Sequence, residues 1–194
     1  MDSNFEMYPW NRLALIAYIV KKHNSMFPNV QLGKTSIQKL IYLFKEHFDV
    51  PLGYRFRFYN YGPFSNSISQ DIETLDSFEV INLVARADVG YDLSINKDSA
   101  FSKLEQKAAD FIEKNKDNLD EVIQCFGKSN AKTLELYATI VWVDRELARN
   151  QFDKNTIEQD IEKNVKKLKP KYSDDEIFKG IDFLKKHDYL LLNP

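Results

Sequence analysis

Cysteine and histidine are scarce in this chain of 194 residues. Cys125 is the single cysteine, which excludes an internal disulfide and a zinc site built on several cysteines, and fits a reducing compartment. His23, His47 and His187 each stand alone, with no second ligand at a spacing that would place two imidazoles on one metal ion. The sequence therefore predicts no metal centre, and the cytoplasm is the expected location.

Long apolar runs and a targeting segment are also missing. The first ten residues have no basic region ahead of an apolar run, and no stretch approaches the roughly 18 apolar residues of a membrane span. Six glycines and six prolines leave little room for flexible linkers. We expect a chain that is neither exported nor inserted into a membrane, and that is ordered nearly from end to end.

The motifs of common catalytic sites are absent as well. The sequence contains no GxxxxGK[ST] loop, GxGxxG turn, GxSxG motif or HExxH helix. Cys125 has no adjacent histidine or basic residue to stabilise a thiolate, which favours a buried structural thiol. We assign no catalytic residue and no cofactor, and predict that the protein is not an enzyme. An unrecognised active site is the third alternative, which convergence of two or more of His23, His47, Asp49 and His187 in one cleft would indicate.

The balance of charge does not favour a partner of one sign. Lysine and arginine number 27 against 29 acidic residues, so no global positive field attracts nucleic acid or anionic lipid. A nucleic-acid role would need a local basic patch. Aromatic residues, in contrast, are abundant, with 14 Phe and 10 Tyr. Most of these rings must pack in the core, and some remain for a partner.

Hydrophobic periodicity predicts two helices at the start of the chain. The first covers residues 10–23, where apolar residues recur at three- and four-residue spacing. The second begins at Thr35 or Ser36 as N-cap, with Gln38 placed to close a capping box, and ends before Pro51.

The next segment mixes strand and helix patterns. Residues 53–61 alternate between two faces and predict one strand, which Gly62 and Pro63 end. The elements expected after it are a helix that Ser65 or Ser67 caps and a hairpin formed by residues 80–87 and 91–95.

Beyond Phe101 the pattern is almost entirely helical. The expected elements are two short helices ending before Gly127, a central buried helix over 133–147, an amphipathic helix over 157–168, a last helix that the capping box Ser173–Glu176 opens, and a short terminal strand over 189–192. The sequence thus predicts an α+β, mainly helical fold. Residues 1–97 would form a winged-helix-like domain with a small antiparallel sheet, and residues 98–194 a helical domain packed against it.

Two groups of basic residues could form binding surfaces or plain solvated faces. The first group consists of Lys34, Lys39, Lys45, Arg55 and Arg57, and the second of Lys163, Lys166, Lys167, Lys169 and Lys171. Surface charges mostly contribute little, and neither group has the interleaved aromatic residues of a single-strand binder. Both interpretations stay open at this point.

Three segments carry a resemblance to a known family. TSIQKLIYLF at residues 35–44, YNYGPFS at 59–65 and LELYATIVWV at 134–143 resemble the YwgA-like family of uncharacterised bacterial and archaeal proteins. The first two are more distantly similar to the Panacea-type antitoxin domain, in which a Lys-Leu-x-Tyr helix precedes a Tyr-Gly-Pro turn. The resemblance implies binding rather than catalysis, because Panacea-type domains neutralise toxins by protein contact and are associated with phage defence.

The expected partner-binding surface combines this resemblance with the basic strand. The resemblance points to the second helix and the turn, and the strand adds its polar face, so the candidate residues are Lys39, Tyr42, Arg55, Arg57, Tyr59, Tyr61, Gly62, Pro63 and Phe64. Gly62 permits a backbone geometry closed to other residues, and Pro63 fixes φ, so the turn also has a purely structural explanation.

The charge of the third helix predicts whether the partner is DNA or another protein. A winged-helix DNA-binding regulator is the main alternative, and would need basic or amide side chains on that helix. Between Asn66 and Glu79 there is no lysine or arginine, and four acidic residues would face or flank phosphates: Asp71, Glu73, Asp76 and Glu79. We therefore expect another protein as partner, in a regulatory, antitoxin or defence role, and leave DNA as the alternative and homo-oligomerisation open.

Overall fold

A computed structural model describes residues 9–86, 90–149 and 157–191. Within these residues the chain forms eight helices and two antiparallel sheets of two strands each, which confirms the predicted α+β, mainly helical fold. The elements are α1 (Pro9–Met26), α2 (Lys34–Phe48), β1 (Arg57–Tyr59), β2 (Gly62–Phe64), α3 (Asn66–Ser77), β3 (Ile81–Arg86), β4 (Gly90–Ile95), α4 (Asp98–Lys107), α5 (Ala109–Phe126), α6 (Ala131–Arg149), α7 (Ile157–Leu168) and α8 (Asp174–Lys186).

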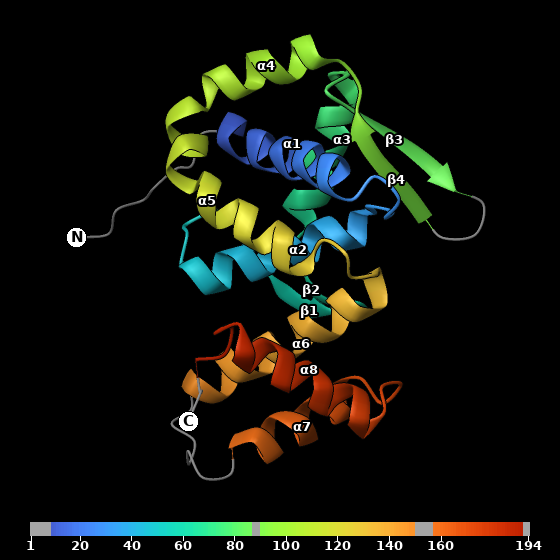
Figure 1. The fold of residues 1–194 in the computed structure, drawn as a ribbon, viewed down its shortest axis with the longest axis vertical. Coiled ribbons are helices and arrows are strands. Elements are labelled where there is room, and N and C mark those ends of the chain that lie inside the picture. The colour runs from blue at the N-terminus through green and yellow to red at the C-terminus, as the bar shows by residue number, and fades with distance from the viewer. Residues whose placement is uncertain (1–8, 87–89, 150–156, 192–194) are drawn as a thin grey trace.

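The helices are stacked along the long axis of the molecule (Figure 1). At one end α1 packs against α3, α4 and α5, and β3 and β4 lie beside these helices. α2 contacts both α5 and α6, and α7 and α8 pack on α6 at the other end. α1 and α2 from the first half of the chain thus pack directly against α4, α5 and α6 from the second half. The division into two domains between residues 97 and 98 stays a prediction.

The central helix is α6, as its apolar residues predict. It contacts α2, α7, α8 and β2, so side chains on nearly every side of it are buried. The close packing extends to Gly180 of α8, where an added Cβ would lie 2.7 Å from the Cδ1 atom of Ile140. Because a carbon–carbon contact of that length is repulsive, only glycine lets α8 approach α6 so closely.

The hairpin that the sequence predicts for residues 80–87 and 91–95 is also confirmed. β3 pairs with β4 in a register that runs from Ile81 opposite Ile95 to Arg86 opposite Gly90. The predicted turn around residues 88–90 lies largely outside the described residues.

The capping box at the start of α8 is formed as expected. The Ser173 hydroxyl accepts a hydrogen bond from the Glu176 amide, and the Ser173 amide donates one to the Glu176 carboxylate.

Three local expectations are wrong. Gly33 rather than Thr35 or Ser36 is the N-cap of α2, and Gln38 closes no capping box because its amide bonds elsewhere. The helix α5 has 18 residues and is not short. No strand forms at 189–191, where Tyr189 is instead buried against the rings of His47 and Phe126; Leu192 lies outside the described residues.

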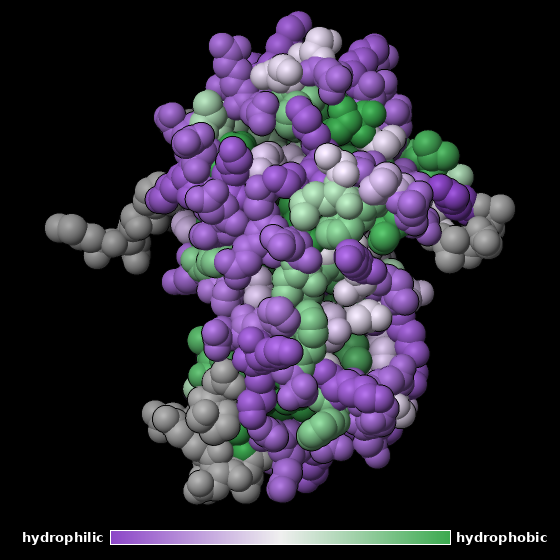
Figure 2. All heavy atoms as spheres, in the orientation of Figure 1, coloured by the Kyte–Doolittle hydropathy of each residue, from purple (hydrophilic) through white to green (hydrophobic). Residues whose placement is uncertain are grey.

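The face of the molecule in Figure 2 is mostly hydrophilic, with apolar side chains gathered in small areas. Among the described helices, none combines the length and the apolar character needed to cross a bilayer.

Candidate binding surface on the first hairpin

Residues 57–64 form a hairpin rather than the single strand predicted for 53–61. β1 pairs with β2, with Arg57 opposite Phe64 and Tyr59 opposite Gly62. Gly62 has φ of 81°, which a glycine adopts without strain where it follows a tight turn. The sequence does not indicate β2, because Gly-Pro usually ends a strand. Here Pro63 lies in a two-stranded sheet, where its missing N–H is tolerated.

The backbone of this hairpin is held by side chains from α2. Lys39 Nζ donates to the carbonyl oxygen of Pro63 at 2.6 Å. The amide of Gln38 donates to the Ser65 carbonyl at 2.9 Å and accepts from the Ser65 amide at 3.0 Å, so it satisfies both groups of that residue. These hydrogen bonds fix the position of the hairpin relative to α2. On the hairpin side they use main-chain groups, which do not depend on the identity of the side chains there.

A second anchor comes from the segment after α7. The Lys169 ammonium group donates to the Asn60 carbonyl at the turn. It also forms an ion pair with Glu135 Oε1 at 2.8 Å, and Lys171 pairs with Glu135 Oε2 at 2.9 Å. Lys169 and Glu135 are both buried. For Lys169, both interpretations of the second lysine group are wrong, because its side chain is neither on a solvated face nor on a binding surface.

Burial changes the acidity of Lys39. Desolvation lowers the pKa of Lys39 from 10.5 to about 7, with the charge of Lys169 acting in the same direction and the Glu135 carboxylate opposing both. The hydrogen bond to Pro63 survives deprotonation, because a neutral amine still carries two donor hydrogens.

The side chains at the turn point outward. Tyr59 is 55% exposed and Tyr61 is 63% exposed, which is unusual for such large rings. The Arg57 guanidinium lies 5.7 Å from the centre of the Tyr59 ring, and the Lys171 ammonium 5.9 Å from that of Tyr61. Phe64 packs against Tyr59 with ring centres 6.0 Å apart.

These rings border a cleft of about 210 Å³ between the hairpin and α2. Lys39, Tyr59, Tyr61 and Phe64 line it, so the structure brings together four of the predicted partner-binding residues, and Gly62 and Pro63 form the backbone behind them. We refer to Arg57, Tyr59, Tyr61 and Phe64 as the hairpin surface.

Two predicted residues lie elsewhere. Tyr42 is 1% exposed and packs edge-on against Phe56, so its ring belongs to the core. With Arg55 it lines a separate cleft of about 410 Å³, which Arg145 and Arg149 also border. Tyr42 is therefore a core residue at the base of this cleft, and Arg55 is exposed beside it.

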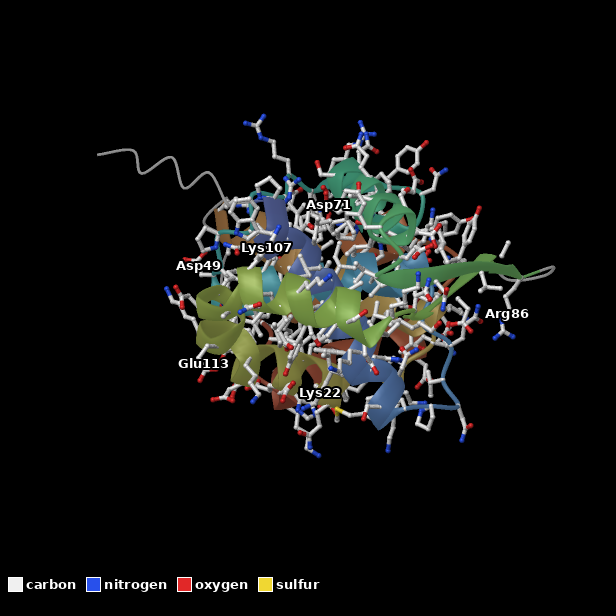
Figure 3. All side chains as sticks on the ribbon, turned by 90° about the horizontal axis from the view of Figure 1, so that it is seen from above. Lys22, Asp49, Asp71, Arg86, Lys107 and Glu113 are labelled. Atoms are coloured by element: carbon white, nitrogen blue, oxygen red, sulfur yellow. The ribbon has the colours of Figure 1, made fainter. Side chains whose placement is uncertain are left out.

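The third helix differs from the acidic face expected of it. Asp71 is buried, accepts from the Tyr54 hydroxyl at 2.7 Å and from Arg12 at 3.2 Å, and so does not face outward. Figure 3 labels Asp71 on α3, and Arg86 where it projects from the β3–β4 hairpin. Its burial raises the pKa of the Asp71 carboxyl, which the hydroxyl and the guanidinium oppose.

The remaining acidic residues of this segment have partners of their own. Glu73 pairs with Lys34 at 3.3 Å, Glu79 pairs with Lys97, and Asp76 accepts from the Leu83 amide at 3.0 Å. The exposed negative charge that was expected to oppose DNA is therefore smaller than the sequence indicates.

The isolated histidines have structural surroundings. His23 is buried with Nε2 2.9 Å from the Gly127 carbonyl oxygen, and His47 stacks on the Tyr189 ring at 3.9 Å between ring centres. Burial lowers the pKa of both imidazoles. Across residues 9–86, 90–149 and 157–191, no group of three or more His, Cys, Asp or Glu side chains could hold a metal ion.

Comparison with known proteins gives no relative: no family model matches the chain, and no curated protein matches it significantly.

Proposed function

We propose that this protein is a non-enzymatic binding module that recognises another protein through the hairpin surface. The observation that carries the proposal is the exposure of Tyr59 and Tyr61, at 55% and 63%, on a backbone held by the buried side chains Gln38, Lys39 and Lys169. Tyrosine and arginine dominate the binding energy of protein interfaces. A rigid support favours binding, because less conformational entropy is lost when the partner docks.

Charge around the rings supports a partner with acidic groups. Arg57 and Lys171 lie against the faces of Tyr59 and Tyr61, and both cations are at the surface. Complementary charges at an interface accelerate association and fix orientation. The finer part of the proposal, a regulatory, antitoxin or defence role, depends only on the resemblance of residues 35–44 and 59–65 to the YwgA-like family and to Panacea-type domains.

A winged-helix DNA-binding regulator is the competing proposal. The order of α2, α3 and the β3–β4 hairpin supports it, together with the burial of Asp71 away from the outer face of α3. Against it, α3 still presents Glu73 and Asp76 and carries no basic residue. Duplex binding depends on neutralising phosphates, so this face gives little affinity.

The experiment is an affinity capture from cells of the source organism after nuclease treatment, with three tagged proteins. These are the wild type, the double variant Tyr59→Ala/Tyr61→Ala, and the control Phe78→Ala/Phe178→Ala. The control removes two rings that are exposed to a similar degree, 65% and 61%, outside the hairpin surface.

We expect one protein to be retained by the wild type and the control and lost by the tyrosine variant, with direct binding then measured on the purified pair. Equal retention by all three proteins would exclude the hairpin surface. Recovery of a specific duplex sequence in a parallel capture without nuclease, with salt-sensitive affinity for the purified chain, would replace the proposal by the DNA-binding alternative.

A further inference from the structure

The cleft between α2 and the first hairpin, here called the hairpin cleft, has the size of a single side chain. Its volume is about 210 Å³, which is below the roughly 300–1,000 Å³ typical of sites for cofactors and small molecules. β2 contacts both α2 and α6, and Figure 1 shows β1 and β2 between these two helices. The hairpin cleft therefore suits one side chain of a partner better than a free ligand.

Lys39 spans the two elements that enclose the hairpin cleft. It starts on α2, its ammonium group donates to the Pro63 carbonyl of the hairpin at 2.6 Å, and it lines the cleft between them. The side chain is 1% exposed, and Pro63 is its only hydrogen-bond acceptor among the described residues. A charged ammonium group carries three N–H donors, so two of them lack an acceptor. Because a buried charged donor without an acceptor costs free energy, an acceptor that entered the cleft would stabilise the charged form.

The remaining polar side chains of the hairpin cleft add donors and no negative charge. Lys34 contributes a second cation, although Glu73 pairs with it at 3.3 Å. The hydroxyls of Thr35 and Ser69 donate to no described residue, and that of Ser69 accepts from Gln38 at 3.3 Å. No acidic side chain is among the described residues that line the cleft. The cleft is thus complementary to a negatively charged group.

The aromatic wall of the hairpin cleft distinguishes an acidic side chain from an inorganic anion. Tyr59, Tyr61 and Phe64 line the cleft, with the rings of Tyr59 and Phe64 centred 6.0 Å apart. Such rings offer apolar contact area, which the methylene groups of a side chain can use and a free anion cannot. An aspartate or glutamate side chain supplies both the apolar stem and the charge.

We infer that the hairpin cleft receives an aspartate or glutamate side chain of the protein partner, with its carboxylate against the Lys39 ammonium group. The inference rests on the proposed function, because it names the partner group that the hairpin surface would recognise. The other charges that act on Lys39 are those of Glu135 and Lys169, which pair with each other at 2.8 Å. Burial lowers the pKa of Lys39 to about 7, so a carboxylate beside it should raise that pKa, and binding should take up a proton.

The test uses blocked amino acids with the full chain and needs no identified partner. Acetyl-glutamate methylamide is the probe, and acetyl-glutamine methylamide is its uncharged isostere. Binding is followed by NMR through the Lys39 side chain and the amides of the residues that line the hairpin cleft. We expect the glutamate probe to bind about five- to tenfold more weakly at pH 8 than at pH 6, because a nearby carboxylate raises a lysine pKa by about one unit or more. The glutamine probe should bind at least about tenfold more weakly at pH 6 and show no dependence on pH.

Three variants assign this behaviour to Lys39. Lys39→Met should lose both the preference for the glutamate probe and the pH dependence. Because this change also removes an anchor of the hairpin, Lys39→Arg is the second variant: it keeps the charge at both pH values and should retain the preference while losing the pH dependence. Lys179→Gln removes a charge at an exposed position on α8 and should behave like the wild type.

The outcomes separate this inference from the proposed function. Equal binding of the two probes at pH 6, or an unchanged pH dependence in Lys39→Arg, would overturn the inference. Equal probe binding together with a captured protein that the tyrosine variant loses would leave the hairpin surface as the interface and overturn only the carboxylate site. Selective binding of the glutamate probe without any captured protein would support the carboxylate site and count against the protein partner.

Discussion

The ammonium group of Lys39 lies 2.6 Å from the carbonyl oxygen of Pro63, inside the protein, and this contact joins α2 to the first hairpin. Lys39 is 1% exposed, and its burial lowers its pKa from 10.5 to about 7. The same side chain therefore holds the hairpin in place and makes the stability of the fold depend on pH.

Replacing Lys39 by methionine should remove part of that dependence. Between pH 7 and 10.5 the unfolded chain keeps the Lys39 proton that the folded chain has released, so wild-type stability rises with pH in this window. Below pH 7 both states are protonated and the cost of burying the charge is constant. From pH 7 to 9 the wild type should gain about 2 kcal/mol relative to Lys39→Met, measured by urea unfolding. Parallel pH profiles for the two proteins would contradict this, and Lys179→Met serves as the exposed control.

Gly62 and Gly90 provide a matched pair for the backbone of the two hairpins. Both have positive φ, 81° and 85°. An added Cβ at Gly62 would lie 3.2 Å from Thr139 Oγ1, whereas at Gly90 it would have no atom of the described residues within 4 Å. Alanine at Gly90 should cost about 1 kcal/mol from backbone strain alone. Alanine at Gly62 should cost about 2 kcal/mol or more, since it also moves the hairpin away from α6. Equal losses in thermal or urea unfolding would show that the contact with Thr139 is unimportant.

Most helices could be predicted from the sequence because their signals are local. The apolar spacing of residues 133–147 and the Ser173–Glu176 capping box each act within one or two turns, and both are confirmed. The β3–β4 pairing was predictable for the same reason. By contrast, β2 has three residues and includes a proline, so nothing local distinguishes it from a turn.

The environment of the charged residues was not predictable. Lys169 follows several lysines and precedes Pro170, which is typical of a solvated helix end, yet it is buried beside Glu135 from a different helix. Asp71 lies on a helix with other acidic residues, but its partners Arg12 and Tyr54 are distant in the sequence. Such pairings depend on tertiary structure, and so does the exposure of Tyr59, which decides whether a ring can contact a partner.

Tyr54 and Tyr18 both donate to aspartates at 2.7 Å, in different surroundings. Tyr54→Phe leaves the buried Asp71 with Arg12 alone and should cost about 2 kcal/mol. The loss should be larger at pH 7 than at pH 4, because burial raises the pKa of the Asp71 carboxyl and so increases the share of it that is protonated and uncharged at the lower pH. Tyr18→Phe should cost less, about 1 kcal/mol, since the more exposed Asp120 keeps its contact with Lys22 at 2.6 Å. Urea unfolding at both pH values measures the difference. A larger loss in Tyr18→Phe would show that burial of Asp71 does not govern the cost.

The thiol of Cys125 should react slowly with thiol reagents in the folded protein. Its burial and the nearby carboxylate of Glu121 raise the pKa of Cys125 from 9.0 to about 11, so at pH 8 its thiolate is about a hundredfold scarcer than that of a thiol with the ordinary value. Because the thiolate is the reacting form, modification by Ellman's reagent should slow by about tenfold or more, since the greater nucleophilicity of a thiolate with a higher pKa offsets part of its scarcity. The chain has one cysteine, so the absorbance change reports this residue alone, and the urea-unfolded chain at the same pH supplies the reference rate. Glu121→Gln should accelerate the reaction of the folded protein several-fold by removing one of the two causes. Similar rates in the folded and unfolded chains would instead identify Cys125 as an accessible, reactive thiol.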